Sequence, residues 1–145
     1  MEQRLSLVTL GVADLARSVA FYEKVVGWKA ASSPPGVAFF DLNGVVFSLF
    51  PHEELAKDMN IAAGAKGGYE GFSLAYNARS QEEVDSVFAR LKKNGATIVK
   101  APETAFWGGY SGYFSDPDGH YWEVAYNPYW TVGRDGRISM EKSGA

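Results

Sequence analysis

The stretch SGYFSDPDGHYWEVAYNP, residues 111–128, decides the fold because it has the pattern of a β-hairpin. Aromatic, strand-forming residues lie on both sides of the turn DPDG, residues 116–119, whose composition is typical of tight turns. Glu123 lies in the middle of the second predicted strand, between Trp122 and Val124. A carboxylate in an aromatic, half-buried strand needs a partner, because burying an unpaired charge is costly. Glu123 is therefore the first candidate functional residue.

The first half of the chain predicts a strand, then a helix, then further strands. Apolar residues alternate over 4–12, as expected of a strand. Asp14 is typical of a helix N-cap, and the helical pattern behind it ends at Gly27. Strands follow over 37–42 and 45–50, joined by an Asn-Gly turn that favours a tight hairpin.

The second half of the chain repeats this order. A strand over 71–78 precedes Ser80, which has Glu83 three residues further on and so forms the sequence pattern of a capping box. An amphipathic helix follows, and further strands begin at residue 96 and end with the hairpin of residues 111–127. A unit of this size buries its sheet poorly alone, whereas two such units share a core.

The sequence therefore predicts one α+β domain over residues 1–145, made of two tandem βαβββ modules whose curved mixed sheets enclose a shared cavity. Its predicted parts are module one over 4–50, a linker over 51–70, module two over 71–127 and a C-terminal tail over 128–145.

Composition excludes several classes of protein. The net charge is −3 and the 14 Lys and Arg residues are scattered, which disfavours nucleic-acid binding. We expect no membrane span, because no apolar run approaches the roughly 20 residues that cross a bilayer. The absence of cysteine excludes disulfides and thiolate metal sites. The first residues lack the layout of a signal peptide, so we expect a cytoplasmic protein.

Two motifs resemble the vicinal oxygen chelate superfamily, which includes glyoxalase I, extradiol dioxygenases, fosfomycin-resistance enzymes and bleomycin-resistance proteins. They are SLVTLGVADLARSVAFYEKVVGW, residues 6–28, and GYFSDPDGHYWEVAYNP, residues 112–128. The resemblance covers both predicted modules. It implies the paired-module fold, a small-molecule ligand and a homodimer.

In metal-using members, the family pattern places ligands on the first and last strands of each module. The resemblance carries these positions over to Leu7, Ser48, Ser73 and Glu123. A Leu side chain cannot coordinate a metal and a Ser hydroxyl is a poor ligand, so a single carboxylate remains. Neither histidine of the chain falls on these positions. We therefore expect no bound metal and no other cofactor.

The resemblance also implies that the face of the strand carrying Glu123 lines the cavity. Strand alternation then predicts further ligand contacts, and a Gly-rich aromatic loop adds two more that suit a lid over the cavity mouth. The predicted contacts are Leu7, Thr9, Phe39, Ser48, Phe50, Ser73, Ala75, Trp107, Tyr110 and Tyr121. Such a lining favours a flat, apolar ligand with a few polar groups.

These observations predict a metal-free protein that binds an apolar or aromatic small molecule in the cavity between the modules. The alternative is a metal-dependent or metal-free lyase, isomerase or dioxygenase of the same superfamily, so whether the protein is an enzyme stays open. In that case Glu123 is the candidate catalytic residue, as metal ligand or general base. A purely structural role for Glu123, bridging Ser48 and Ser73, is a third interpretation.

Overall fold

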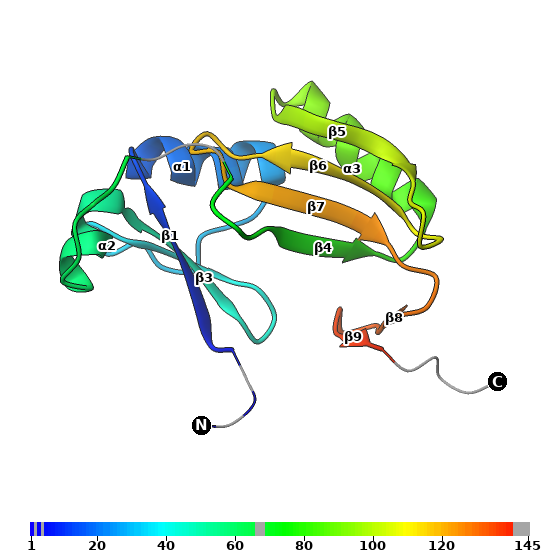
Figure 1. The fold of residues 1–145 in the computed structure, drawn as a ribbon, viewed down its shortest axis with the longest axis horizontal. Helices are drawn as coiled ribbons and strands as arrows, with labels where there is room; N and C mark the ends of the chain where they lie inside the picture. Colours follow the sequence, from blue (N-terminus) through cyan, green and yellow to red (C-terminus); the bar gives the residue numbers. More distant parts are fainter. Residues whose placement is uncertain (2, 4, 66–68, 141–145) are drawn as a thin grey trace. The chain divides into compact units, whose positions relative to one another are not determined.

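The computed structural model describes residues 1, 3, 5–65 and 69–140. The chain divides into two compact units, Met1–Gly68 and Tyr69–Ala145, which are considered one at a time. Each unit contains a mixed β-sheet together with helices, which confirms the α+β class (Figure 1).

The elements of the first unit are β1 (Leu7–Val12), α1 (Leu15–Phe21), the π-helical turn η1 (Tyr22–Val26), β2 (Ala38–Asp41), β3 (Val46–Pro51) and α2 (His52–Asp58). The strands form a sheet of order β1-β3-β2, in which β1 and β3 are parallel and β2 and β3 antiparallel. As predicted, Asp14 caps the first helix by accepting a 2.9 Å hydrogen bond from the backbone N–H of Arg17. Gly27 ends it with a φ of 89°, a value that glycine adopts without strain.

Aromatic rings form much of the core of this unit. Tyr22 and Phe47 pack edge to face with their ring centroids 4.9 Å apart, and Trp28 stacks on Tyr22 at 5.6 Å. Phe40 lies 6.0 Å from both Tyr22 and Phe47. Such pairs add to the free energy gained from area burial alone. They fix one face of the sheet as the core side of this unit.

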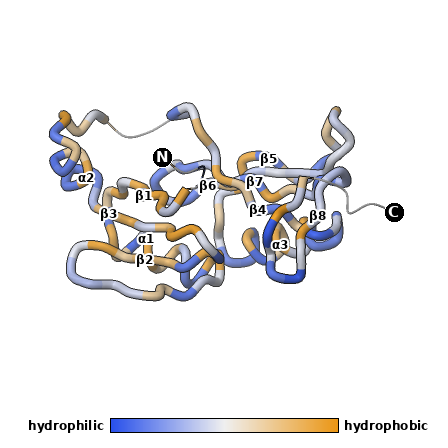
Figure 2. Tube along the Cα trace, turned by 90° about the horizontal axis from the view of Figure 1, so that it is seen from below, coloured by the Kyte–Doolittle hydropathy of each residue, from blue (hydrophilic) through white to orange (hydrophobic). Residues whose placement is uncertain are grey.

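The elements of the second unit are β4 (Leu74–Ala78), α3 (Gln81–Lys93), β5 (Thr97–Thr104), β6 (Tyr110–Ser115), β7 (Tyr121–Tyr126), β8 (Thr131–Val132) and β9 (Ile138–Ser139). Strands β4 to β7 form a sheet of order β4-β7-β6-β5. Helix α3 begins at the predicted Ser80 cap and buries Val84, Phe88 and Leu91 on one side. Figure 2 shows both hydrophobic and hydrophilic residues along α3, as expected of an amphipathic helix.

Some local details differ from the sequence-based expectations. The region expected to be a linker, 51–70, contains the last residue of β3 and the whole of α2. The expected tail forms the small hairpin β8–β9, which the residue pattern did not indicate. Residues 66–68 and 141–145 of these two regions lie outside the described residues, and the proposed module boundaries stay a prediction. Within the described residues, every helix is too short or too polar to cross a bilayer.

Candidate functional site

Four residues of the second unit lie side by side across its sheet. Glu123 on β7 pairs with Ala75 on β4 on one side and with Tyr113 on β6 on the other. Tyr113 in turn pairs with Lys100 on β5. We call Glu123, Tyr113 and Lys100 the polar row. It combines a carboxylate, a phenol and an ammonium group on three adjacent strands.

The polar row lies on the face of the sheet that α3 does not cover. Trp122 and Phe114, the neighbours of Glu123 and Tyr113 in sequence, are buried and stack with their ring centroids 6.3 Å apart. Val124 is also buried, and α3 contacts the strands on this side. Because side chains alternate along a strand, Glu123 and Tyr113 point to the opposite face, where both are partly exposed. Figure 1 shows α3 running along this sheet.

The groups of the polar row interact electrostatically. Burial raises the pKa of Tyr113, the nearby Glu123 carboxylate raises it further, and Lys100 lowers it. The raised pKa favours the protonated phenol, so Tyr113 brings a hydrogen-bond donor to the face that carries Glu123. The hydrogen bond to Glu103, 2.8 Å from the Lys100 Nζ to Oε1, raises the pKa of Lys100, desolvation lowers it, and the charges of the Glu103 and Glu123 carboxylates raise it further. Lys100 is thus a fixed cation beside two carboxylates.

Lys100 reaches the row because β5 follows an irregular path. The register between β5 and β6 shifts on both sides of the Lys100–Tyr113 pair, so Val99 is an extra residue in β5. Gly112 on β6 permits this path. A Cβ at that position would lie 2.7 Å from the Lys100 carbonyl oxygen and 2.7 Å from the Phe88 ring.

The corresponding row in the first unit is neutral. Ser48 on β3 pairs with Thr9 on β1 and with Phe39 on β2, and an isolated bridge joins Phe39 to Ser32. The Ser48 hydroxyl is buried and donates a 3.0 Å hydrogen bond to the Thr9 hydroxyl. The same positions of the repeated topology therefore hold a hydroxyl pair in one unit and charged groups in the other.

The predicted contact residues fall into separate groups. The strand register places the first-unit residues on the face opposite the aromatic core and places Ala75, Tyr121 and Glu123 on the face opposite α3. The first-unit members of this set are Leu7, Thr9, Phe39, Ser48 and Phe50. Ser73 is exposed and precedes β4, which begins one residue later. The structure does not test whether any of these residues contacts a ligand.

The two residues of the expected lid, Trp107 and Tyr110, contact neighbouring parts of their own unit. The Trp107 ring folds over Gly109, since a Cβ on Gly109 would lie 1.8 Å from it, and the turn is closed by a 2.8 Å hydrogen bond from the Ala105 N–H to the Gly109 carbonyl. Tyr110 donates a 2.8 Å hydrogen bond to Asp85 on α3. Tyr110 therefore points to the α3 side of the sheet and does not share a face with Glu123. Its role as a ligand contact, like that of Trp107, stays a prediction.

The residues present do not fit the metal centre that the family pattern implies. Of the four ligand positions, Leu7 has no donor atom and Ser48 uses its hydroxyl to bind Thr9. Among the residues that the structure describes, no group of three His, Cys, Asp or Glu side chains is arranged to hold a metal ion. His52 lies in α2 with its Nε2 2.9 Å from the Gly64 carbonyl oxygen. We therefore derive no chemical step through a metal ion.

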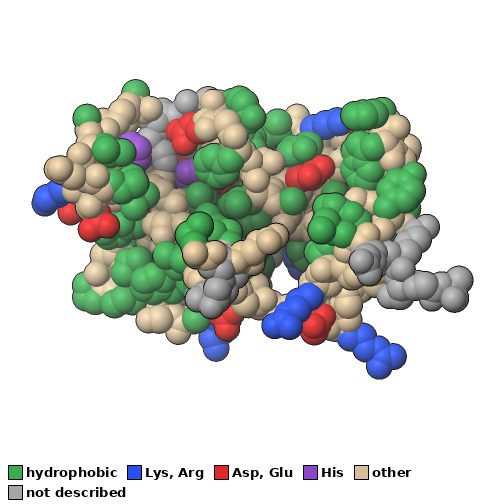
Figure 3. All heavy atoms as spheres, turned by 60° about the horizontal axis from the view of Figure 1, so that its bottom comes forward, with side chains coloured by type: hydrophobic (Ala, Val, Ile, Leu, Met, Phe, Trp, Pro, Cys, Tyr) green, Lys and Arg blue, Asp and Glu red, His purple; other side chains and the backbone are tan. Residues whose placement is uncertain are grey.

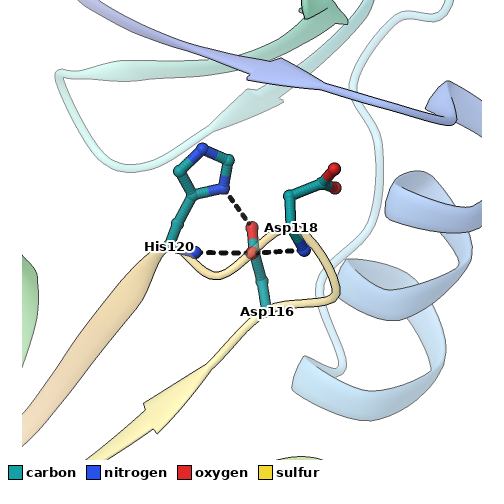
Figure 4. A network of polar contacts seen from close by, with 3 residues as sticks. All are labelled: Asp116, Asp118 and His120. Atoms are coloured by element: carbon teal, nitrogen blue, oxygen red, sulfur yellow. Dashed lines mark hydrogen bonds and ion pairs between the residues drawn. The ribbon is translucent and has the colours of Figure 1, made fainter. Parts of the chain in front are cut away.

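The other histidine belongs to a buried turn (Figure 4). Nδ1 of His120 lies 2.7 Å from Oδ2 of Asp116, whose side chain is fully buried. Oδ1 of Asp116 accepts hydrogen bonds of 2.9 Å from the backbone N–H groups of Asp118 and His120. This network holds the β6–β7 turn in shape and so fixes the strand on which Glu123 lies three residues later.

Sequence reasoning missed two members of the polar row. Strand alternation along 110–115 is the signal that places Tyr113 on the face opposite that of Phe114, which is the face of Glu123. The position of Lys100 had no such signal, because the extra residue in β5 breaks the alternation. Figure 3 shows hydrophobic side chains over much of one face of the molecule, with acidic and basic side chains among them.

A separate hollow lies in the first unit, at the ends of β1 and β3 and the start of α2. Its volume is about 400 Å³. It is lined by Val12, Ala13, Pro51, His52, Glu53 and Glu54, none of which belongs to the predicted contact set.

Comparison with known proteins places this site in a family. Residues 4–124 match the family model described as Glyoxalase/Bleomycin resistance protein/Dioxygenase superfamily. The chain is 29% identical over 121 residues to a metallothiol transferase FosB from Lysinibacillus sphaericus, covering 83% of this chain and 80% of that protein. It is 32% identical over 129 residues to a probable trivalent organoarsenical cleaving enzyme from Bacillus subtilis, covering 82% and 77% respectively. A crystal structure of a glyoxalase-related enzyme from Fulvimarina pelagi superposes with a TM-score of 0.88 at 33% identity, over 97% of this chain and 100% of that one. The family match, which extends over most of the chain and over both repeated units, shows that the protein belongs to the glyoxalase/bleomycin resistance protein/dioxygenase superfamily.

Proposed function

We propose that this protein binds an apolar or aromatic small molecule without a metal ion, with Glu123 as a polar contact of the ligand. Family membership supports a small-molecule function. The polar row supports the position of the ligand, because its three groups lie on adjacent strands on the sheet face opposite α3. A carboxylate on that face, beside a phenol, can accept a hydrogen bond from a ligand.

The donor set around Glu123 is the observation that carries the metal-free proposal. Glu123 pairs with Tyr113 across the sheet and interacts electrostatically with Lys100. In a metal centre the neighbours of a ligating carboxylate are further ligands, such as His or Asp. Here a cationic side chain stands beside the carboxylate instead, and a second cation at the same place would be repelled.

The names of the relatives favour a second candidate function. One is called a metallothiol transferase and another a probable trivalent organoarsenical cleaving enzyme, so the names of some relatives of this chain are those of enzymes. Under this alternative the protein is a lyase, isomerase, dioxygenase or transferase with Glu123 as metal ligand, or a metal-free enzyme with Glu123 as general base. The metal-dependent version requires donors at positions where this chain has Leu7 and Ser73.

Metal analysis of the purified protein separates these functions. After equilibration with Zn²⁺, Ni²⁺ or Mn²⁺ and removal of free ions, we expect far less than one ion per chain by mass spectrometry, and no rise in melting temperature. Uptake of about one ion per chain that is lost in Glu123→Gln would overturn the metal-free proposal.

Ligand binding is tested with a panel of aromatic acids, amides and amines in a thermal-shift assay. We expect at least one aromatic compound to raise the melting temperature, because a ligand that binds only the folded state stabilises it. A panel without any effect would contradict the binding function. The expected homodimer and the cytoplasmic location stay predictions, and light scattering on the eluted protein measures the first of them.

A further inference from the structure

We propose that Lys100 makes the site selective for aromatic hydroxy acids. Its ammonium group binds the carboxylate of the ligand, while Glu123 and Tyr113 bind a hydroxyl group at the other end of the same molecule. This inference rests on the proposed ligand-binding function and adds the chemical class of the ligand.

The geometry of the sheet gives the polar row two chemically different ends. Glu123 on β7 and Lys100 on β5 are separated by β6, which carries Tyr113. Two strand spacings amount to about 10 Å between backbones. The two end groups extend from the same face, so a benzene ring with substituents at opposite positions has the length to contact both.

The ammonium end is accessible to a ligand. The side chain of Lys100 is 45% exposed and that of its partner Glu103 is 63% exposed. Ion pairs this exposed contribute little to stability, so an incoming carboxylate competes with Glu103 at small cost. A lysine also carries three N–H donors, which allows Glu103 and a ligand carboxylate to bind at the same time.

The other end of the row selects a hydroxyl group rather than an acid. Glu123 brings a carboxylate to this end of the row, opposite Tyr113 on the neighbouring strand. A second carboxylate placed there would be repelled, whereas a ligand hydroxyl donates to a lone pair of Glu123. The order of charges along the row therefore fixes the ligand orientation, with its acid group at β5 and its hydroxyl at β7.

The irregular backbone of β5 sets the position of Lys100 opposite Tyr113. The extra residue in β5 interrupts regular pairing with β6, and the absence of a side chain at Gly112 is what admits this irregular path. In an uninterrupted β5 the register would place Val99, an apolar residue, opposite Tyr113.

Isothermal titration calorimetry with matched probes tests the proposal. The probes are 4-hydroxybenzoate, its neutral analogue 4-hydroxybenzamide, and benzoate, which lacks the hydroxyl. For the natural chain we expect 4-hydroxybenzoate to bind at least about fivefold more tightly than either analogue, as expected for a charge-assisted contact at a partly exposed site. Raising the salt concentration should reduce the preference over the amide.

Variants assign each preference to a residue. Lys100→Met should abolish the preference for the acid over the amide, and Lys100→Arg should retain it. Tyr113→Phe should reduce the preference for 4-hydroxybenzoate over benzoate and leave the acid preference in place. Lys93→Met, on the exposed end of α3, removes the same charge elsewhere and should change neither. Circular dichroism and melting temperature confirm that each variant folds.

The outcomes separate this inference from the proposed function. Equal binding of the acid and the amide to the natural chain, or an acid preference that survives Lys100→Met, overturns the inference alone and leaves ligand binding intact. Failure of all three probes and of the wider aromatic panel overturns both.

Discussion

The sheet face opposite the aromatic core in the first unit and the sheet face opposite α3 in the second have the same strand arrangement and different chemistry. In the first unit the row Thr9, Ser48, Phe39 is neutral, and its hydroxyl groups bind each other at 3.0 Å. In the second unit the equivalent strands carry Ala75, Glu123 and Tyr113, and the next strand adds Lys100. The aromatic core of the first unit and the α3 contacts of the second lie on the other face of each sheet. Of these two rows, only that of the second unit carries ionisable side chains.

The hairpin turns of the two units also differ, because the Asp at the turn is buried in the second unit and exposed in the first. Substitution of the buried Asp has the largest expected effect on stability. Asp116, in the β6–β7 turn, is buried and bound to His120 and two backbone N–H groups. We expect Asp116→Ala to lower the free energy of unfolding by about 3 kcal/mol, because it leaves buried donors without an acceptor. Urea denaturation followed by circular dichroism measures this.

The matched control for that change is Asp41→Ala in the β2–β3 turn of the first unit. Asp41 is exposed and accepts one 3.1 Å hydrogen bond from the Asn43 N–H. We expect a loss of only about 0.5 kcal/mol there, since water replaces the lost contact. Equal losses at the two turns would contradict the view that burial of the Asp116 network stabilises the second hairpin.

Substitutions in the Ser48–Thr9 hydroxyl pair of the first unit are expected to cause the next largest loss of stability. Ser48→Ala leaves the Thr9 hydroxyl without this partner, and Thr9→Val does the same to the buried Ser48 hydroxyl. We expect each single change to cost about 1 kcal/mol and the double change to cost clearly less than the sum, because the two groups satisfy each other. Additive losses in a double-mutant cycle would show that the hydroxyl groups are not coupled.

The sequence predicted most of the scaffold and only part of the site, for reasons that individual residues make clear. Cap residues such as Asp14, Gly27 and Ser80 act through local backbone hydrogen bonds, so their patterns located the helices correctly. Regular alternation around Glu123 predicted its face. The neighbours of Glu123 across the sheet depend on register, which is a non-local property.

The place of Lys100 in the polar row could not be predicted from the residue pattern of β5. The register shifts in β5 depend on how the strand fits against Gly112 and Phe88, and neither the bulge nor its partner is visible in a short stretch of sequence. The buried pair Asp116 and His120 was hidden for a related reason. A DPDG turn is ordinarily exposed, and only tertiary packing shows that its first carboxylate is enclosed.

Substitutions at the helix starts of the two units are expected to change the free energy of unfolding least. Helix α1 begins with one capping bond, to Asp14, whereas α3 begins with Ser80 and with Glu83, which accepts a 2.7 Å bond from the Arg79 N–H and another from the Tyr76 hydroxyl. Although partial burial works against it, these hydrogen bonds and the charge of Arg79 lower the pKa of Glu83. Ionised Glu83 therefore stabilises the folded state.

The sign of the pH dependence follows from that lowered pKa. The stabilising contribution of Glu83 is fully present above the ordinary glutamate value of 4.5 and is lost as the pH falls through the lower folded-state pKa. We expect Glu83→Gln to reduce the free energy of unfolding by about 0.5–1 kcal/mol at pH 7, and the difference from the natural chain to shrink in acid. Glu54→Gln serves as control, because Glu54 is exposed in α2 and makes only a 3.8 Å contact with Lys57. If the gap at Glu83 stays constant between pH 7 and strong acid, its carboxylate charge is not what holds the start of α3, and the two helix starts differ only in their neutral hydrogen bonds.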